Sequence, residues 1–336
     1  MTRVAINGFG RIGRAFLRLV VQQQVAAEVV AINDLGDVHN LAYLLKYDSV
    51  YGTAPFAVAV EDGALVVAGK KIAVFAEKEP AKIPWASVGV DVVVESTGFF
   101  TDFTKAHAHI DAGAQRVVIS APAKGDVGSG ETILMGLNEE KLATCTVSSN
   151  ASCTTNASSP VIAILDEAIG IEKAILNTTH SYTATQALVD GPSKKGPREG
   201  RAAALNMIPS STGAALAVTQ AYPALAGKFD GISIRVPTPA GSIADITFIA
   251  KRDTTVEEVN AALKAAAADA RWHGIFSVTE DELVSSDIVG DTHGSVADLT
   301  MTRVVGGNLV KVLAWYDNEM GYTHTLVEHV MKAVRS

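Results

Sequence analysis

Cysteine is scarce in this chain, with only Cys145 and Cys153 in 336 residues. Two cysteines cannot build a disulfide framework, and thiols in a reducing compartment stay free. The chain also lacks any uninterrupted apolar run near the roughly 18 residues of a membrane span. The segment Met1-Thr2-Arg3 leads directly into a strand-like run without a signal-peptide pattern. We therefore expect a cytoplasmic protein in which a thiol function is possible.

An excess of basic residues is also missing. The formal charge is −8, from 28 Lys and Arg against 36 Asp and Glu, and both signs are mixed along the chain. Nucleic acids and anionic membranes select basic faces or polybasic runs, so neither is expected as a partner. No spacing of Cys and His predicts a metal site. Hydrophobic residues make up 48% of the chain, which fits a globular protein with large cores and a length sufficient for two domains.

The first third of the chain alternates short β-branched runs with a helical pattern. Apolar runs that end at turn-forming or polar residues occupy positions 3–8, 28–34, 91–97 and 116–122. Such runs are typical of parallel strands covered on both faces. Between the first two, apolar residues fall at helical spacing at positions 12, 16, 19 and 20. This succession predicts a βαβ unit, and residues 56–75 predict antiparallel additions to it.

After Asn150 strands and helices no longer alternate one for one. Helices are predicted over 161–170, 256–270 and 325–336, and strands over 231–240, 243–252 and 308–317. This change of pattern predicts a second domain of the α+β class.

A GxGxxG motif, residues 8–13, directly follows the first predicted strand and opens the first predicted helix. Gly8 allows a tight turn, Gly10 allows the backbone to approach a pyrophosphate, and Gly13 allows the helix to lie close to the strand. The helix N-terminus offers free N–H groups and a positive dipole end to the anion. The motif therefore predicts a dinucleotide site.

Asp34 indicates which dinucleotide binds. It ends the second strand, 24 residues after Gly10, where a carboxylate can accept hydrogen bonds from both hydroxyls of the adenosine ribose. A carboxylate there would repel a ribose phosphate, so the sequence favours NAD over NADP. The alternative is a glycine turn between two packed elements, with Asp34 as a helix cap.

The segment SNASCTTNA, residues 149–157, surrounds Cys153 with hydroxyl and amide side chains. A helix N-terminus or a nearby imidazole lowers the pKa of a thiol and so favours the nucleophilic thiolate. Residues that favour helix starts follow the cysteine, and an apolar run begins at Val161. Pro160 leaves two alternatives open. The helix starts near Ser159, where proline suits the first turn, or it starts at Cys153 and contains the proline.

Among the eight histidines, His180 lies in a similarly polar string, residues 177–183, at the end of a predicted strand. It is a candidate base for Cys153, although a Cys and a His in separate stretches are more often structural. His107 and His109 lie in a helical surface pattern. A hydroxyl-rich setting is missing at His273, His293, His324 and His329.

Eight motifs, by their order and approximate spacing, resemble the glyceraldehyde-3-phosphate dehydrogenase family: NGFGRIGR, LLKYDSV, SNASCTTN, HSYTATQ, VDGPS, PSSTGAA, RVPTP and WYDNEMGY. The likeness covers essentially the whole chain. It implies a Rossmann-type dinucleotide-binding domain, residues 1–152 joined by the C-terminal helix 319–336. It also implies a catalytic domain, residues 153–318, with a mainly antiparallel sheet.

The resemblance also implies the reaction. The family oxidises and phosphorylates D-glyceraldehyde 3-phosphate to 1,3-bisphosphoglycerate with NAD and inorganic phosphate, a reversible step that serves both glycolysis and gluconeogenesis. Cys153 would attack the aldehyde to form a thiohemiacetal and then a thioester. His180 would act as general base and help to hold the oxyanion beside the Cys153 backbone N–H. The loop over residues 182–201 matches a segment that contacts a neighbouring subunit near its NAD, which implies a homotetramer.

The resemblance places further site residues position by position. Contacts to pyrophosphate and ribose match Gly8, Gly10, Arg11, Ile12, Gly13 and Asp34, and nicotinamide-side contacts match Thr97, Ser120 and Asn318. Donors to the substrate phosphate match Thr183 and Arg235, and donors to inorganic phosphate match Ser152, Thr154, Thr212 and Gly213. On the residues alone, Arg235 reads as an exposed strand arginine and Thr212-Gly213 as a helix cap.

Two departures from the family pattern are visible. Ala157 stands where many members carry a second cysteine, so oxidised Cys153 could not be trapped locally as a disulfide. Glu199 stands where some members have an additional arginine for inorganic phosphate, between Arg198 and Arg201. The site for inorganic phosphate therefore matches the family pattern less closely than the site for the substrate phosphate does.

Two alternatives remain. Erythrose-4-phosphate dehydrogenase shares the fold, the Cys and His, and the cofactor, and one carbon in a substrate changes discrimination by only roughly 1–3 kcal/mol. The HSYTATQ motif and the Thr212-Gly213 turn favour the triose enzyme. The other alternative is a non-catalytic NAD-binding redox sensor that uses Cys153. Retention of His180 and of the anion donors argues against it.

Overall fold

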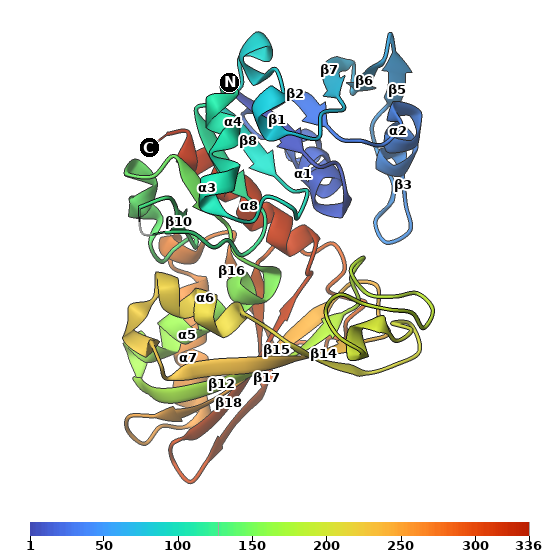
Figure 1. The fold of residues 1–336 in the computed structure, drawn as a ribbon. Coiled ribbons are helices and arrows are strands. Elements are labelled where there is room, and N and C mark those ends of the chain that lie inside the picture. The colour runs from blue at the N-terminus through green and yellow to red at the C-terminus, as the bar shows by residue number, and fades with distance from the viewer. Residues whose placement is uncertain (127, 336) are drawn as a thin grey trace. The chain divides into compact units, whose positions relative to one another are not determined.

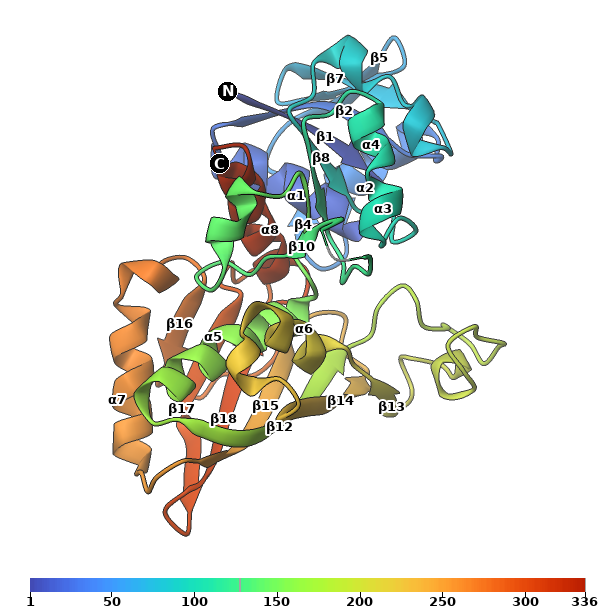
Figure 2. The same ribbon diagram turned by 60° about the vertical axis from the view of Figure 1, so that its left-hand side comes forward.

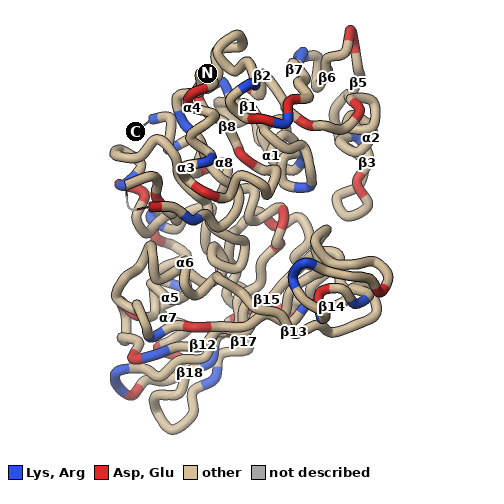
Figure 3. Tube along the Cα trace, viewed as in Figure 1, with Lys and Arg blue, Asp and Glu red and all other residues tan. Residues whose placement is uncertain are grey.

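The computed structural model of the chain describes residues 1–126 and 128–335. It divides into two compact units, Met1–Ala151 with Thr323–Ser336, and Ser152–Tyr322. The limits expected from the sequence lay at residues 152/153 and 318/319. Lysines, arginines and acidic residues are interspersed in both units (Figure 3). Within the described ranges, no helix is both long and apolar enough to cross a membrane.

The first unit is built on a nine-stranded sheet with the order β10-β11-β9-β8-β1-β2-β7-β6-β5 (Figure 1). Neighbours from β10 to β7 pair in parallel, whereas β5, β6 and β7 form an antiparallel extension. This arrangement confirms the predicted Rossmann-type sheet. The strands are β1 (Thr2–Asn7), β2 (Ala27–Asn33), β5 (Val58–Glu61), β6 (Ala64–Val67), β7 (Lys70–Phe75), β8 (Val92–Glu95), β9 (Arg116–Ile119), β10 (Glu131–Thr132) and β11 (Val147–Ser149).

The central strand β1 explains why this sheet needs helices on both faces. Val4, Ala5 and Ile6 point alternately to the two faces, and all three are fully buried.

A small separate hairpin is formed by β3 (Tyr47–Asp48) and β4 (Gly52–Thr53). The helices are α1 (Arg11–Gln22), α2 (Val38–Lys46), α3 (Phe103–Ala106), α4 (Ala108–Asp111) and α8 (Met320–Ala333), with 3-10 helices η1 (Pro80–Lys82), η2 (Trp85–Val88) and η3 (Glu139–Ala143).

The second unit contains a seven-stranded sheet with the order β13-β14-β12-β15-β18-β17-β16. Only the β12–β14 and β16–β17 pairs are parallel, so the sheet is mainly antiparallel, as expected. The strands are β12 (Ile171–Ser181), β13 (Ile208–Ser211), β14 (Phe229–Val236), β15 (Ser242–Ala250), β16 (Phe276–Thr279), β17 (Ser295–Val305) and β18 (Leu309–Tyr316).

Three helices lie against one face of this sheet (Figure 2). Burial along β15 alternates strictly between buried and half-buried residues, the pattern of a strand with one covered face. The helices are α5 (Cys153–Ala168), α6 (Ala214–Ala221) and α7 (Val256–Ala267), with 3-10 helices η4 (Arg198–Gly200), η5 (Pro223–Leu225) and η6 (Ala270–Trp272).

Strand β17 was not predicted from the sequence, because polar residues interrupt its apolar run. These residues find partners in the fold. The Thr302 hydroxyl donates to Asn260 Oδ1 at 2.7 Å, and Trp315 Nε1 donates to Asp298 Oδ2 at 3.1 Å. The pairing of β17 with β18 shifts register between Asp298 and Arg303. Local pattern reading cannot anticipate partners that are distant in the sequence.

Candidate active site

The thiol of Cys153 lies at the N-terminus of α5. The helix begins at Cys153 itself and contains Pro160, which resolves the two alternatives left open by the sequence. Ser152 caps it, because its Oγ accepts from the backbone N–H of Thr155 at 3.1 Å. The helix N-terminus, with its N–H groups and positive dipole end, favours negative charge at this position.

The turn that leads into α5 is strained. Ala151 has φ of 53°, a left-handed conformation that costs a residue with a Cβ atom about 1 kcal/mol or more. The Ser149 hydroxyl accepts from the Ala151 N–H at 3.0 Å and donates to the Ala121 carbonyl at 2.6 Å. These bonds hold the turn that directs the chain from β11 into the helix carrying the cysteine.

His180 faces the thiol from the end of β12. Its Nε2 lies 3.3 Å from Cys153 Sγ. The neighbouring Ser181 carbonyl, which can only accept, lies 2.6 Å from His180 Nδ1. When Nδ1 carries the ring proton and donates it to this carbonyl, Nε2 is an acceptor toward the thiol, the arrangement that a general base requires. The structure thus brings the two predicted residues together.

Arg235 is the third member of this cluster. The parallel pairing of β12 and β14 places His180 opposite Arg235. The Arg235 Nη1 atom donates to the Ser181 carbonyl at 3.2 Å and also lies 2.6 Å from His180 Nδ1. A guanidinium can only donate, so a proton on Nδ1 requires the Arg235 N–H to be directed to the carbonyl. Burial, together with this positive charge, lowers the pKa of His180 to about 3. The imidazole is therefore neutral at physiological pH.

The Cys153 thiol experiences opposing influences. Burial raises its pKa, whereas the charge of Arg235 and hydrogen bonds to Thr154 act in the lowering direction. Because the pKa of the thiol is raised, Cys153 carries a proton before it reacts. This proton must move from Sγ to the neutral His180 Nε2 as the sulfur attacks. This requirement gives His180 a definite task in any nucleophilic reaction of Cys153.

Sequence reasoning missed Tyr316, which supports this cluster. Its hydroxyl lies 2.9 Å from Thr154 Oγ1 and 2.7 Å from Thr178 Oγ1, and its ring contacts the His180 imidazole edge-on at a centroid distance of 5.9 Å. Tyr316 ends a predicted strand, but nothing in the local sequence indicates which hydroxyls it meets. The Thr154 side chain is consequently buried and engaged.

The residues expected to bind phosphates lie in several places within the second unit. Thr212 and Gly213 precede α6, where Thr212 Oγ1 accepts from the Ala214 N–H at 3.2 Å and Gly213 is the N-cap. They therefore lie at a helix start, as the helix-cap alternative expected. A helix N-terminus is also a place where anions bind. The Thr183 and Thr185 hydroxyls are 3.0 Å apart.

A hollow of about 990 Å³ in the second unit is lined by Arg198 and Arg235 together with Lys195, Ser210 and Ser211. Arg201, by contrast, forms an exposed ion pair with Asp190 at 2.9 Å. The buried Glu199 also lines this hollow and accepts from the Ser210 hydroxyl. Arg235 is therefore not an isolated exposed arginine, and a carboxylate lies in the same basic hollow.

The glycine motif has the geometry of a dinucleotide loop. Gly8 adopts φ of 92°, and a Cβ atom there would lie 2.6 Å from the Thr97 backbone nitrogen. At Gly13 a Cβ atom would collide with the Gly8 carbonyl oxygen, whereas at Gly10 it would meet nothing within 4 Å. Gly8 and Gly13 are thus required by the fold, and the space beside Gly10 suits a ligand.

This difference predicts opposite outcomes for two alanine substitutions. Gly13→Ala is expected to destabilise the first unit by about 1–3 kcal/mol, because backbone must move to relieve the clash. Gly10→Ala is expected to leave the melting temperature unchanged but to weaken NAD binding at least about tenfold, because the methyl group occupies the place of the pyrophosphate. Thermal unfolding and NAD titration of both variants test this. Equal loss of stability in the two would contradict it.

Asp34 is tied to the glycine loop and does not cap a helix. Its Oδ2 accepts from the Phe9 N–H at 2.7 Å and its Oδ1 from the Gly36 N–H at 2.8 Å. The N-cap of α2 is instead Asp37, which rules out the helix-cap alternative for Asp34. Each oxygen of Asp34 keeps a lone pair for a further donor.

A hollow of about 510 Å³ adjoins these residues within the first unit. Gly8, Gly10 and Asp34 line it together with residues from the ends of β1, β2 and β8. In open α/β sheets, ligands bind at the carboxyl ends of the strands. The cradle beside Gly10, the helix start at Arg11 and the carboxylate of Asp34 together fit the pyrophosphate and the ribose of NAD.

Replacement of Asp34 tests the ribose contact. Asp34→Asn keeps the size and one acceptor oxygen but removes the charge, so we expect NAD affinity to fall about tenfold and the preference for NAD over NADP to shrink. Asp37→Asn, a neighbouring acceptor that caps α2, is the matched control. Titration with both dinucleotides distinguishes the variants, and an unchanged preference in Asp34→Asn would remove Asp34 from the ribose site.

The remaining residues expected to contact NAD lie in both units. Thr97 lines the hollow of the first unit, and Ser120 follows β9 with its N–H bonded to the Glu95 carbonyl at 2.9 Å. Arg11 pairs with Asp48 at 2.5 Å, and Ile12 is half-buried in the first turn of α1. Asn318 belongs to the second unit and accepts from the Ser242 hydroxyl at 3.0 Å.

One expectation about the histidines was wrong. His109 does not lie on the surface, because it is fully buried and bonded to Trp85 and Glu95. A signal was present: His109 follows Phe103 and Ala106 at intervals of three residues, on the face that these apolar residues bury. His329, also set aside, is buried with its Nε2 2.8 Å from the Ser148 hydroxyl.

Comparison with known proteins agrees with these geometric features. The family model for the NAD-binding domain of glyceraldehyde 3-phosphate dehydrogenase matches residues 2–103, and that for its C-terminal domain matches residues 152–318. Glyceraldehyde-3-phosphate dehydrogenase of Clostridium pasteurianum is 51% identical over 332 residues, which cover 97% of both chains. The Streptomyces coelicolor enzyme of the same name is 48% identical over 328 residues, 97% of this chain and 96% of the relative.

A relative from a third organism gives the same result. Glyceraldehyde-3-phosphate dehydrogenase 1 of Kluyveromyces lactis is 47% identical over 334 residues, 98% of this chain and 100% of the relative. Two domain models and full-length identity near one half, together with a thiol–imidazole pair and a dinucleotide loop, lead to one conclusion. The chain belongs to the glyceraldehyde-3-phosphate dehydrogenase family of NAD-dependent oxidoreductases.

Proposed function

We propose that this protein oxidises and phosphorylates D-glyceraldehyde 3-phosphate to 1,3-bisphosphoglycerate with NAD and inorganic phosphate, through covalent intermediates on Cys153. The observation that carries the proposal is the 3.3 Å approach of Cys153 Sγ to His180 Nε2 at the N-terminus of α5. Family membership supports the substrate, and the reversible reaction serves both glycolysis and gluconeogenesis.

Cys153 and His180 carry the chemistry at the aldehyde carbon. The sulfur attacks the carbonyl while its proton passes to His180 Nε2, and the product is a thiohemiacetal. NAD, when bound, supplies the hydride acceptor that converts this adduct into a thioester. During that conversion His180 takes the hydroxyl proton, after its first proton has been released to solvent. The Cys153 backbone N–H stabilises the oxyanion.

Inorganic phosphate completes the reaction. One of its oxygens attacks the thioester carbonyl, the carbon–sulfur bond breaks, and Cys153 leaves as a thiolate that regains a proton. The acyl group departs as an acyl phosphate. The thioester preserves the energy of aldehyde oxidation until phosphate, rather than water, accepts the acyl group.

Two groups of donors are assigned to the two phosphates. We assign the substrate phosphate to Thr183 and Arg235, since a guanidinium matches phosphate oxygens in a bidentate manner. Arg198 is added as a candidate because it lines the same hollow as Arg235. Inorganic phosphate is assigned to the N-terminal turns of α5 and α6, through Ser152, Thr154, Thr212 and Gly213.

The two units take separate roles in this proposal. The first is the NAD-binding domain, with the glycine loop and Asp34 at the dinucleotide, Arg11 and Ile12 beside the pyrophosphate, and Thr97 and Ser120 at the nicotinamide side. The second is the catalytic domain and contributes Asn318 to the nicotinamide.

We also propose a cytoplasmic homotetramer. The segment between β12 and β13, residues 182–207, contains the loop over residues 182–201. It supports assembly because it exposes large apolar side chains that a monomer would leave in water. They are Leu188, Val189, Leu205 and Met207, each at least 74% exposed. Sedimentation analysis of the purified protein tests the tetramer.

The assay that tests the activity measures NADH formation from glyceraldehyde 3-phosphate and NAD, with and without inorganic phosphate, beside erythrose 4-phosphate. We expect rapid, phosphate-dependent turnover of the triose phosphate. Turnover of erythrose 4-phosphate alone would indicate erythrose-4-phosphate dehydrogenase instead. Absence of turnover with either, in a protein that binds NAD, would favour the redox sensor.

A further inference from the structure

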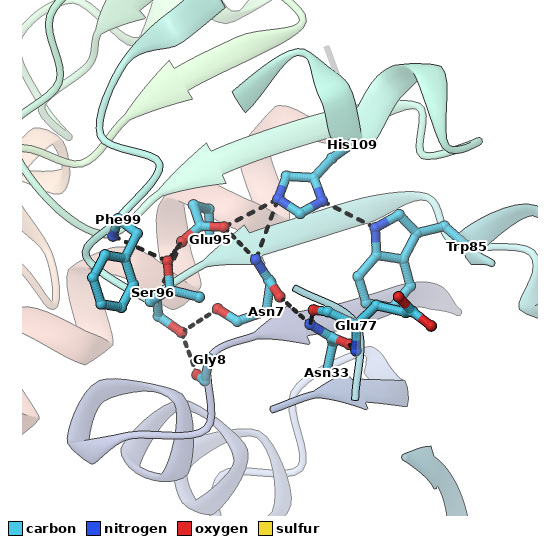
Figure 4. Close-up of polar contacts among 10 residues, drawn as sticks. Asn7, Gly8, Asn33, Glu77, Trp85, Glu95, Ser96, Phe99 and His109 are labelled. Atoms are coloured by element: carbon cyan, nitrogen blue, oxygen red, sulfur yellow. Dashed lines mark hydrogen bonds and ion pairs between the residues drawn. The ribbon is translucent and has the colours of Figure 1, made fainter. Parts of the chain in front are cut away.

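A buried polar network in the first unit takes no part in the steps above. Glu95, at the C-terminal end of β8, is 1% exposed, and its partners Asn7 and His109 are equally buried. Figure 4 shows these side chains converging on the Glu95 carboxylate. Within the described part of the chain, no lysine or arginine forms an ion pair with it. A buried carboxylate without a cation must be satisfied by hydrogen-bond donors.

At one end of the network, Trp85 determines the protonation of His109. The indole Nε1 can only donate, and it lies 3.0 Å from His109 Nδ1. Nδ1 must therefore be an acceptor, and the ring proton is on Nε2, which lies 3.0 Å from Glu95 Oε2. His109 is thus a neutral imidazole that donates to Glu95.

At the other end, a backbone N–H orients two amide side chains. The Glu77 N–H donates to Asn33 Oδ1 at 2.8 Å, so Asn33 Nδ2 points the other way and donates to Asn7 Oδ1 at 2.7 Å. The Asn7 amide is thereby oriented with Nδ2 toward Glu95 Oε2, at 2.5 Å. Asn7 is therefore a second obligatory donor to the carboxylate.

Thr97 supplies two more donors. Its backbone N–H donates to Glu95 Oε1 at 2.8 Å, and its hydroxyl oxygen lies 2.5 Å from the same atom. The hydroxyl oxygen also accepts from the Phe99 N–H at 3.1 Å, which directs the hydroxyl proton to Glu95. The two oxygens therefore accept from four donors: His109 Nε2, Asn7 Nδ2, and the backbone N–H and hydroxyl of Thr97. A proton on either oxygen would point at one of these donors. Glu95 is present as a fully hydrogen-bonded anion.

We propose that Glu95 is a positioning residue for NAD that acts through Thr97 and Asn7, both of which line the dinucleotide hollow. Thr97 also sets the position of the glycine turn, because its backbone nitrogen lies against Gly8. Glu95 itself does not line the hollow. The inference rests on the proposed use of NAD, and it assigns to this anion the task of holding the hollow in its binding shape before NAD arrives.

Glu95→Gln tests the role without changing size. In either orientation, the new NH₂ group faces N–H or O–H donors and cannot accept hydrogen bonds from them. The hydrogen bonds to Thr97 or the hydrogen bond to Asn7 is therefore lost. We expect NAD affinity, measured by calorimetry on the cofactor-free protein, to fall about tenfold. Thr97→Val is expected to weaken NAD as well, and Glu95→Gln should then cause a smaller loss in the Thr97→Val background than in the wild type.

Asp91→Asn is the matched control. Asp91 precedes the same strand at its opposite end, where it accepts from the Arg3 N–H at 2.8 Å, far along β8 from the hollow. Asp91→Asn should lower the free energy of unfolding without changing NAD affinity. Unchanged NAD affinity in Glu95→Gln, or strictly additive losses in the double variant, would overturn the inference.

A second variant covers the case in which Glu95→Gln does not fold. Glu95→Asp keeps the anion but retracts it by one methylene, so it cannot reach all four donors, and an NAD affinity equal to that of the wild type would likewise overturn the role. Failure of the wild-type protein to bind NAD would instead contradict the proposed function.

Discussion

Replacement of Cys153 by serine is expected to lower the rate of aldehyde oxidation by about 10⁴-fold or more, the scale seen when a covalent nucleophile is removed. A serine hydroxyl has a far higher pKa than a thiol, and His180, with its pKa lowered to about 3, is too weak a base to activate it. NAD affinity should not change, because the dinucleotide hollow is lined by residues of the first unit. Stopped-flow measurement of the first turnover gives the rate.

Cys145 provides the control for this experiment. It is a partly buried thiol of the first unit, and burial likewise raises its pKa. Cys145→Ser should therefore oxidise the aldehyde at the wild-type rate, and a thiol-specific label should still inactivate it. Retention of turnover in Cys153→Ser would refute the thiohemiacetal and thioester mechanism.

Replacement of His180 by asparagine is expected to reduce kcat by about 10²–10⁴-fold, the usual contribution of a general base. Asparagine keeps a polar group near Ser181 but cannot take the thiol proton. In the wild type the imidazole is neutral at physiological pH, since its pKa is lowered to about 3 by burial and by Arg235. The loss is therefore expected in kcat, while the KM for NAD stays unchanged.

The pH dependence of thiol alkylation provides a second readout. Burial raises the pKa of Cys153, so a thiol without a proton acceptor is protonated at neutral pH and becomes reactive only as the pH rises. The rate of alkylation by iodoacetamide at neutral pH should therefore fall in His180→Asn, which has no base to take the proton as the sulfur attacks, and should recover as the pH approaches the pKa of the thiol. His293→Asn, a partly exposed histidine paired with Asp291 at 2.9 Å, serves as control. An alkylation rate at neutral pH identical to that of the wild type would show that His180 does not take the proton.

Much of the fold could be predicted from the sequence where a pattern is local. The doubly apolar runs became the parallel strands β1, β2, β8 and β9, because a strand covered on both faces has no polar side to display. The GxGxxG spacing became a real turn with Gly8 at a positive φ. The start of α5 at Cys153 could not be predicted, because Pro160 also suits a first helical turn.

The errors and omissions share one cause. Tyr316, the partners of β17 and the hydrogen bonds of His109, whose burial alone had a local signal, depend on contacts between residues that are separated in the chain. His109 meets Glu95 across 14 residues, and Thr154 meets Tyr316 across 162. Polar side chains look like surface residues in a local pattern, because burial is favourable only after a distant partner supplies the missing hydrogen bond.

The sequence by itself determined the two-domain plan, the dinucleotide loop, the candidate Cys153 and His180, and, by resemblance, the family. Each depends on spacing along the chain or on motifs that can be read without coordinates. Only the tertiary structure decided that Cys153 starts its helix, that Arg235 lies against His180, and that Glu95 is an anion held by four donors. Protonation states and hydrogen-bond directions follow from three-dimensional neighbours, because a buried donor or acceptor takes its role from the group that it faces.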